Sequence, residues 1–324
     1  MPTNVIELVT KYIPMLDYQY KVGAKSAILD APADIVEETK SAKKVRIPKM
    51  ALTGLKNYSR NKGFLYGVQT LTWEEHEFTM DRGSRFQVDV MDDVESLGVA
   101  YGRLAQEFQR MHVIPELDAY RFMTYAQLAG TKDTTAPSTT NVTKLIQDAE
   151  TVLDEAEVIE EGRIMFVTPT FNNILNQSEK LQKRFDTQTK TDDMGVNFKI
   201  RLFDGMPFIV VPQTRFKSAY VFYDGETAGQ ENGGFVPAVD EVNAADMTKN
   251  AKDLNFMIIH PSAVMQIMKR AITRVFAPTK DLAAQTGAWG VAQNIDGWDI
   301  QDRLYHDAFV LDNKVKGIYV NHNA

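Results

Sequence analysis

The side chains that most often perform catalysis are sparse in this sequence and lack the spacing that an active site needs. No cysteine is present, which excludes disulfides, thiolate nucleophiles and Cys-ligated zinc. The sequence has no HExxH pair, no phosphate-binding loop ending in Lys-Ser/Thr, no GxGxxG after a strand and no GxSxG elbow. The five histidines are scattered: His76, His112, His260, His306 and His322. Zinc hydrolysis, nucleotide use and nucleophilic catalysis are therefore disfavoured.

Carboxylate groups are the remaining candidates for chemistry. Glu74, Glu75 and Asp81 are close in sequence, but no nucleophile or ligand set accompanies them. Residues 192–195 and 224–234 are rich in acids and glycines yet lack the alternating Asp or Asn ligands of a calcium loop, so we expect surface loops there. We predict no catalytic residue, no cofactor and no metal site. A soluble enzyme with an unrecognised carboxylate site remains an alternative.

Charge is distributed in two oppositely charged ribbons. Residues 40–62 contain eight Lys or Arg and no acid, whereas residues 74–95 contain eight acids and two arginines. A compact domain usually mixes its surface charges, so this split predicts that one ribbon meets its opposite on a neighbouring copy of the chain. A solvated charged face without function is the alternative interpretation.

Bulk composition indicates a folded protein. The 324 residues suit about two domains, and 44% hydrophobic with 24% charged residues is typical of globular chains. A net charge of -7 opposes broad, sequence-independent binding to nucleic acid. The first twenty residues include Glu7 and Asp17 and predict no signal peptide. No run of eighteen apolar residues occurs, so no membrane span is expected.

The first half of the chain predicts an extended ribbon followed by a long helix. Alternation at residues 68–78 and 86–90, on either side of a turn signal at 81–84, predicts a two-stranded excursion over 44–90. Such a ribbon is marginal alone and needs a partner surface. Apolar residues spaced by three and four from Val94 to Met111 predict a helix that Pro115 kinks and that continues to Leu128.

The second half predicts a mixed α+β domain after a small, polar boundary at residues 130–141. We expect a helix over 142–156, a strand over 164–167 and a helix that begins at 168–170. A hairpin over 198–211 turns at 204–205. A strand over 256–259 leads to a second helix opened by residues 260–262. This order lacks the regular βαβ alternation of a doubly wound fold.

Several motifs give the sequence a family resemblance. They are AKKVRIP at 42–48, TGLKNYSR at 53–60, FQVD at 86–89, VIPELDAYR at 113–121 and RLYHDAFVLDN at 303–313. Together they resemble the major capsid protein of tailed phages with Gram-positive hosts, the family with the Hong Kong 97-type capsid fold. The resemblance implies an N-terminal arm (1–40), an extended β-hairpin loop (41–90), a peripheral domain with a spine helix (91–139 and 300–324) and a mixed α/β axial domain (140–299).

The resemblance also implies a non-enzymatic function. The chain would self-assemble through hexamers and pentamers into an icosahedral shell that encloses double-stranded phage DNA. Its place would be the virion, after assembly in the bacterial host cytoplasm. A separate scaffolding protein, a portal and non-specific contact with packaged DNA are the expected partners, without a membrane. The alternative is an encapsulin-type nanocompartment shell that holds a cargo enzyme.

Contacts between subunits are predicted at charged residues and one tryptophan: Arg46, Lys49, Arg60, Lys62, Trp73, Glu74, Glu75, Asp81, Arg82, Glu116, Asp118 and Arg121. Surface ion pairs contribute about 0–1 kcal/mol each, so they would set register more than affinity. Apolar residues such as Leu55, Phe64, Leu71 and Trp73 would contribute most of the burial. Some relatives link a loop lysine to an asparagine of a neighbour. Lys56 or Lys62 with Asn313 or Asn321 are conceivable here, but we do not expect a cross-link.

Overall fold

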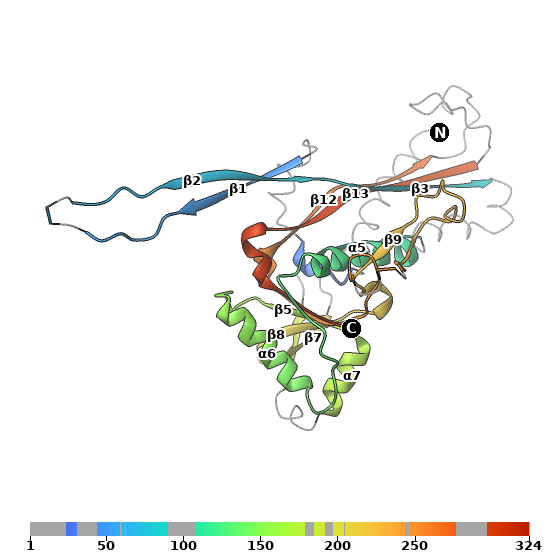
Figure 1. Cartoon of the computed structure of the whole chain (residues 1–324). Coiled ribbons are helices and arrows are strands. Elements are labelled where there is room, and N and C mark those ends of the chain that lie inside the picture. Colours follow the sequence, from blue (N-terminus) through green and yellow to red (C-terminus); the bar gives the residue numbers. More distant parts are fainter. Residues whose placement is uncertain are drawn as a thin grey trace.

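The computed structural model describes residues 24–30, 44–58, 60–61, 63–89, 108–178, 185–191, 197–203, 205–240, 242–243, 246–276 and 297–323. A layered α/β body carries a separate sheet along its top, and a long two-stranded hairpin extends from that sheet to one side (Figure 1). No helix in these ranges is both long and apolar enough to cross a membrane.

The centre of the body is a seven-stranded mixed sheet. Its order is β4 (Thr131–Asp133), β14 (Ile318–His322), β11 (Leu254–Ile259), β5 (Ile164–Val167), β8 (Met206–Val210), β7 (Asn197–Phe203) and β6 (Phe185–Thr191). Successive side chains of a strand point to opposite faces. Ile164 and Phe166 of β5 therefore join the core on one side of the sheet, and Met165 and Val167 join the core on the other.

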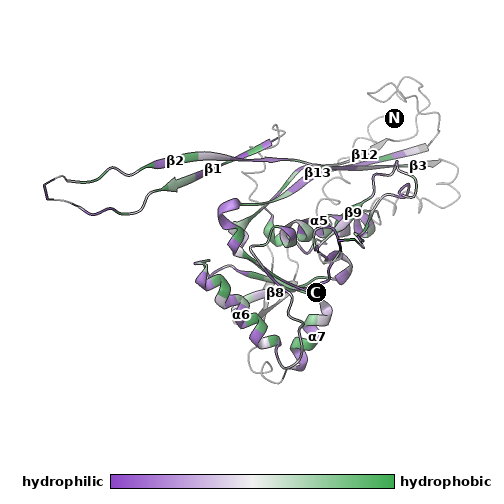
Figure 2. Cartoon of the chain, in the orientation of Figure 1, coloured by the Kyte–Doolittle hydropathy of each residue, from purple (hydrophilic) through white to green (hydrophobic). Residues whose placement is uncertain are grey.

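Helices cover both faces of this sheet. On one face, α5 (Ile114–Gln127) contributes Phe122, Tyr125 and Ala126 to the larger core. On the other, α6 (Val142–Glu155) and α7 (Pro169–Gln177) bury their apolar stripes. Figure 2 shows hydrophobic and hydrophilic residues interspersed along α6 and α7, as helices with one buried face require. Coverage on both faces explains why β5 and β11 are nearly continuous apolar runs.

Local signals correctly predicted several elements of the body. The helix over 142–156 and the strand over 164–167 are confirmed as α6 and β5. The Thr168 hydroxyl accepts a hydrogen bond from the Phe171 amide at 3.2 Å and caps α7, whose first residue is Pro169. The hairpin β7–β8 turns at Gly205, which has a φ of 84° that favours glycine.

The helix predicted after residues 260–262 is wrong. A single 3₁₀ turn, Pro261–Ala263, leads directly into the strand β12 (Val264–Phe276). Both faces of this strand are covered at its start, because Val264 faces the large core and Ile267 packs against Phe78 and Phe309. A strand buried on both faces need not alternate, so its apolar spacing imitated a helix.

A three-stranded sheet joins β12, β13 (Gly297–Val310) and β3 (Met80–Asp89) in that order. The turn predicted at 81–84 is also wrong, since these residues lie inside β3 and pair with β13. A Cβ on Gly83 would lie 3.0 Å from the Asp302 carbonyl oxygen, so glycine here permits close approach of two strands. The two-stranded excursion is shorter than predicted and pairs only β1 (Lys44–Leu52) with β2 (Gln69–Glu77).

The predicted long helix is described in its second half only, because residues 91–107 lie outside the described residues. A π-helical turn, Gln109–Val113, precedes α5. Pro115 lies in the first turn of α5, directly after the π-helical turn, whose closing hydrogen bond runs from the Ile114 amide to the Gln109 carbonyl oxygen.

Segments near the two ends of the chain join sheets and cores that the predicted domain ranges do not separate. Residues 24–30, within the predicted arm, include the 3₁₀ turn Ala27–Leu29 and bury Leu29 in the large core. The C-terminal strands divide, since β13 joins the three-stranded sheet and β14 joins the seven-stranded sheet. The names arm, peripheral domain and axial domain stay predictions.

Candidate assembly interface

The β1–β2 hairpin brings the two charge ribbons together within one chain. Its antiparallel register places Lys44 opposite Glu77 and Arg46 opposite Glu75. The Arg46 Nη2 atom lies 2.5 Å from the Glu75 Oε1 atom, and the Lys44 Nζ atom lies 3.8 Å from a Glu77 oxygen. These side chains are 41–65% exposed, so solvent screening leaves each pair about 0–1 kcal/mol. Part of the predicted charge pairing is therefore satisfied inside the subunit.

Beyond these ion pairs the same face of the hairpin becomes apolar. Directly opposed residues share a face, and here Pro48 opposes Trp73 while Met50 opposes Leu71. The tip that follows exposes further large apolar side chains, which include Leu55, Phe64 and Tyr66. Of the eighteen exposed large hydrophobic residues among those described, ten lie between Met50 and Trp73. A contiguous apolar surface of this kind is typical of a protein–protein contact.

The opposite face of the hairpin is packed at its base and fixes the hairpin on the body. Val45 lies in a small core with Phe78, Ile267 and Phe309. The His76 ring stacks on the Phe309 ring with their centroids 4.7 Å apart.

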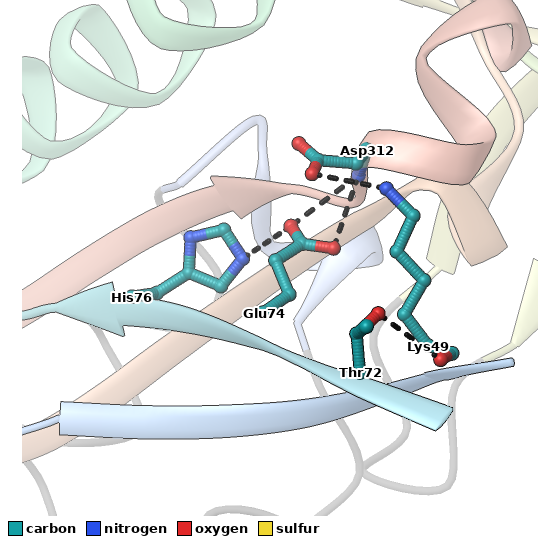
Figure 3. A network of polar contacts seen from close by, with 5 residues as sticks. All are labelled: Lys49, Thr72, Glu74, His76 and Asp312. Carbon is teal, nitrogen blue, oxygen red and sulfur yellow. Dashed lines mark hydrogen bonds and ion pairs between the residues drawn. The ribbon is translucent and has the colours of Figure 1, made fainter. Parts of the chain in front are cut away.

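A polar network reinforces this attachment (Figure 3). The Glu74 carboxylate accepts a hydrogen bond from the Asp312 amide at 3.3 Å and lies 2.6 Å from the His76 Nε2 atom. The Lys49 Nζ atom donates to the Asp312 carboxylate at 3.2 Å. Asp312 begins the 3₁₀ helix Asp312–Gly317, which leads into β14. Lys49 and Glu74, predicted as contacts between subunits, thus anchor the hairpin within the chain.

Arg82, on β3, forms hydrogen bonds to α5 and to a surface loop. Its Nε atom donates to Glu116 of α5 at 2.6 Å, and its two Nη atoms donate to the carbonyl oxygens of Tyr223 at 2.6 Å and Gly234 at 3.3 Å. These carbonyls stand at the two ends of the loop between β9 (Tyr220–Phe222) and β10 (Phe235–Pro237). Arg82 therefore holds both ends of that loop against β3 and α5.

The neighbouring Asp81 also has an intrachain partner. The Arg303 Nε atom donates to Asp81 at 2.8 Å, and this hydrogen bond lowers the pKa of the Asp81 carboxyl.

Asp118 and Arg121 are buried, which removes both from any surface that a neighbour could reach. Asp118 accepts hydrogen bonds from the Ser26 amide at 3.1 Å and hydroxyl at 2.8 Å, and from Arg215 at 3.3 Å. Arg121 donates to the Ser26 hydroxyl at 2.9 Å and lies 3.0 Å from an Asp30 oxygen. Ser26 and Asp30 did not stand out in the sequence, because about ninety residues separate Ser26 from its partners.

The remaining predicted contact residues lie at the hairpin. Trp73 is 57% exposed and Arg60 is exposed at the tip, whereas Lys62 lies outside the described residues. Asn321 is buried and bonded to Asn255 and Asp133, so it cannot reach a lysine of another copy. In the part of the chain that the structure describes, no cluster of three His, Cys, Asp or Glu could hold a metal ion.

Comparison with known proteins identifies the fold. No protein-family model matches the sequence, and no curated protein matches it either. A solved structure from Mycobacterium phage Che8 superposes with a TM-score of 0.58 at 15% identity, over 90% of this chain and 89% of that one. The capsid of the Cyanophage P-SCSP1u gives 0.53 at 13% identity, over 88% and 84% of the two chains. The mature capsid of bacteriophage PhiM1 gives 0.54 at 11% identity, over 87% and 82%. The chain therefore has the mixed α+β fold of phage capsid structures.

Proposed function

We propose that this chain is the major capsid protein of a tailed phage, which self-assembles into an icosahedral shell around double-stranded DNA. The exposed apolar hairpin is the observation that carries the proposal, because monomeric soluble proteins rarely expose so many apolar side chains in one segment. The shared fold with phage capsids supports it.

The physical argument begins with the hairpin's dependence on a partner. A two-stranded ribbon is marginal in water, and its outer half contributes nothing to the hydrophobic cores of the body. Fully burying a side chain such as Leu55 or Phe64 contributes about 1.5–3 kcal/mol. Exposed ion pairs contribute less, so apolar burial supplies affinity and charge sets orientation.

The asymmetry of the contact determines the form of the assembly. The hairpin projects from one side of the body, and we propose that it binds a different surface on the neighbouring copy. Such a heterologous contact closes into a ring when the rotation between copies is right. Rings of six and five copies would supply the hexamers and pentamers of the shell.

Further partners follow from this function. We propose a separate scaffolding protein and a portal, assembly in the host cytoplasm and a final place in the virion. Contact with packaged DNA would be non-specific and confined to local basic surface, since the chain has a net charge of -7. A nanocompartment shell is not favoured, because the three structures compared above come from phages.

Electron microscopy tests the proposal directly. The chain is expressed alone and with a candidate scaffolding protein, and the particles are imaged. Shells of uniform diameter are expected, and particles purified from a phage lysate should contain DNA. A chain that stays a folded monomer under both conditions would contradict the function, and shells filled with an enzyme would favour a nanocompartment.

A further inference from the structure

Three buried polar side chains lie where α5 packs against the three-stranded sheet. They are Tyr125 of α5, Gln266 of β12 and His306 of β13, and each is at most 2% exposed. Two neighbours of Gln266, Val264 and Ala308, belong to the same large hydrophobic core as Tyr125. Polar side chains in such a place cost free energy unless their polar atoms have hydrogen-bond partners.

The strand register places Gln266 and His306 on the face of the sheet that α5 covers. Gln266 lies opposite Ala308, and Met268 lies opposite His306. Residues two apart in a strand share a face, so Gln266 and His306 are diagonal neighbours, a relation that separates two residues by about 7–8 Å. From α5, the Tyr120 ring stands edge-on to the His306 ring with their centroids 5.5 Å apart.

Tyr125 reaches the same place from the helix. Burial raises the pKa of its hydroxyl, whereas the positive charge of Arg121 and the nearby Gln266 side chain lower it. The Tyr125 hydroxyl therefore lies close to Gln266. Arg121 also lies 3.0 Å from an Asp30 oxygen, and the Asp30 backbone forms a bridge to the Gln266 backbone. α5, the sheet and residues 24–30 thus surround one polar site.

The polar atoms at this site have no protein partner in bonding geometry within the part of the chain that the structure describes. These atoms are the Tyr125 hydroxyl, both side-chain amide atoms of Gln266 and the His306 Nδ1 atom. A direct bond between Tyr125 and Gln266 would satisfy one amide atom and leave the other, with the His306 nitrogen, unpaired. Native proteins leave few buried polar atoms unpaired, and ordered water commonly binds those that lack a protein partner.

We infer that at least one ordered water molecule binds between α5 and the three-stranded sheet and joins Tyr125, Gln266 and His306. A buried water typically makes about three hydrogen bonds and can both donate and accept, which matches three groups on three elements. The bound water holds α5, β12 and β13 at one spacing without direct bonds between their polar side chains. The site is internal to one subunit, so the inference does not depend on the proposed assembly.

The protonation state of His306 fits this ligand. Burial, with the positive charges of Arg121 and Arg82, lowers the pKa of His306 to about 3. The ring is therefore neutral at pH 7 and has one donor and one acceptor nitrogen. Water can bond the Nδ1 atom in either role.

A high-resolution density map tests the site, from crystals of the chain or from images of its particles. We expect a water peak about 2.5–3.2 Å from the Tyr125 hydroxyl and from an amide atom of Gln266. Gln266→Met should remove this peak, because the variant side chain has a similar shape but no strong hydrogen-bonding atom. A map in which the side chains bond each other directly, or in which another side chain fills the space, would overturn the inference.

Unfolding equilibria provide a second test in solution. Tyr125→Phe and Gln266→Met remove polar atoms with little change in shape, so each should lower the folding equilibrium constant by roughly tenfold. If one water links the two groups, the double variant should lose much less than the roughly hundredfold that independent effects would give. The matched control is Tyr66→Phe, whose hydroxyl group lies on an exposed side chain and should contribute nothing.

The outcomes keep this site separate from the proposed function. Stabilisation by either substitution would show that the polar atoms are unpaired in the folded chain. Independent losses in the double variant would show that no shared water joins them. Either result would overturn the hydrated site and leave the capsid function intact, whereas failure of the chain to form shells would leave the hydrated site intact.

Discussion

At the scale of single residues, buried charges hold the first described segment of the chain in place. Asp118 is fully buried and receives its hydrogen bonds from Ser26, Lys25 and Arg215. Arg121, 1% exposed, donates a hydrogen bond to the Ser26 hydroxyl, which in turn donates to Asp118. A buried charge is tolerated only when its partners are present, so this cluster specifies one position for residues 24–30.

Replacing Asp118 should therefore destabilise the subunit itself. Asp118→Ala leaves Arg215 and the amide and hydroxyl of Ser26 without their acceptor and should lower the free energy of unfolding by about 3–5 kcal/mol. Urea unfolding of the unassembled chain measures this. The control Asp148→Ala, on the exposed side of α6, should change it by less than about 0.5 kcal/mol. A similar small effect at Asp118 would contradict the interpretation.

His306 should make the subunit sensitive to acid. Burial, with the positive charges of Arg121 and Arg82, lowers the pKa of His306 from 6.5 to about 3. The unfolded chain then binds a proton between about pH 6.5 and pH 3 that the folded chain does not. Stability contributed by the neutral ring is complete above pH 6.5 and is lost as the pH falls, by up to about 1.4 kcal/mol per pH unit.

Comparison of the parent chain with His306→Gln isolates this contribution. Urea unfolding at pH 7 and pH 5 should show a shallower loss of stability in the variant. Asp302, whose pKa is raised by burial, contributes the opposite slope at lower pH but is common to both proteins. Parallel pH profiles for the two chains would exclude His306 as the cause.

At the scale of elements, the hairpin has a base that is packed on the body and an outer half that is exposed. Its base combines the core around Val45 and Phe309 with the Glu74 and Lys49 contacts to Asp312. Its outer half has no packing partner among the described residues and exposes Met50, Leu71 and Trp73. This division separates folding, which needs the base, from assembly, which needs the tip.

Polar substitution of the tip should abolish shells and spare the fold. Leu55→Ser/Phe64→Ser/Tyr66→Ser removes apolar surface that only a neighbour buries, so shells seen by electron microscopy should disappear. The melting temperature of the monomer should change little, because these side chains belong to no hydrophobic core of the subunit and the Phe64 ring meets only the exposed Tyr58 ring of the same tip. Val152→Ser/Ile159→Ser, which replaces two exposed apolar side chains on the body, should assemble normally. Normal shells from the triple variant would contradict a role for the tip.

At the scale of the whole molecule, the fold combines a body that completes its own core with a hairpin that projects from one side. The seven-stranded sheet has helices on both faces, so the body needs no neighbour to complete its core. If the hairpin of one copy binds a separate surface of the next, the same chain can build rings of different size, since each contact involves only two copies.

High salt should distinguish the contribution of exposed ion pairs from that of apolar burial in the contacts between copies. At about 1 M ionic strength the screening length falls to about 3 Å, which weakens exposed ion pairs and leaves apolar burial intact. Light scattering should show slower assembly at 1 M than at 0.1 M NaCl, because charge orients encounters. Shells already formed should persist at high salt by electron microscopy. Rapid disassembly there would mean that ion pairs, and not apolar contacts, hold the shell.

The sequence by itself determined the elements whose signals are local. The apolar stripe of α6, the Thr168 cap and Pro169 of α7, and the glycine turn between β7 and β8 each depend on neighbouring residues. Alternation at residues 68–78 pointed to an extended strand, which the structure shows as β2. These predictions held because short-range periodicity and capping are properties of a few consecutive residues.

Only the tertiary structure decided which partners the residues meet. Coverage on both faces made β12 a strand where spacing suggested a helix, and pairing with β13 made residues 81–84 a strand where composition suggested a turn. Arg82, Asp118 and Arg121 found partners within the chain, far away in sequence. A residue's type and spacing define what it can bind. Whether its side chain is buried, and which partner it meets, depends on residues that are distant in sequence and become neighbours only in the folded chain.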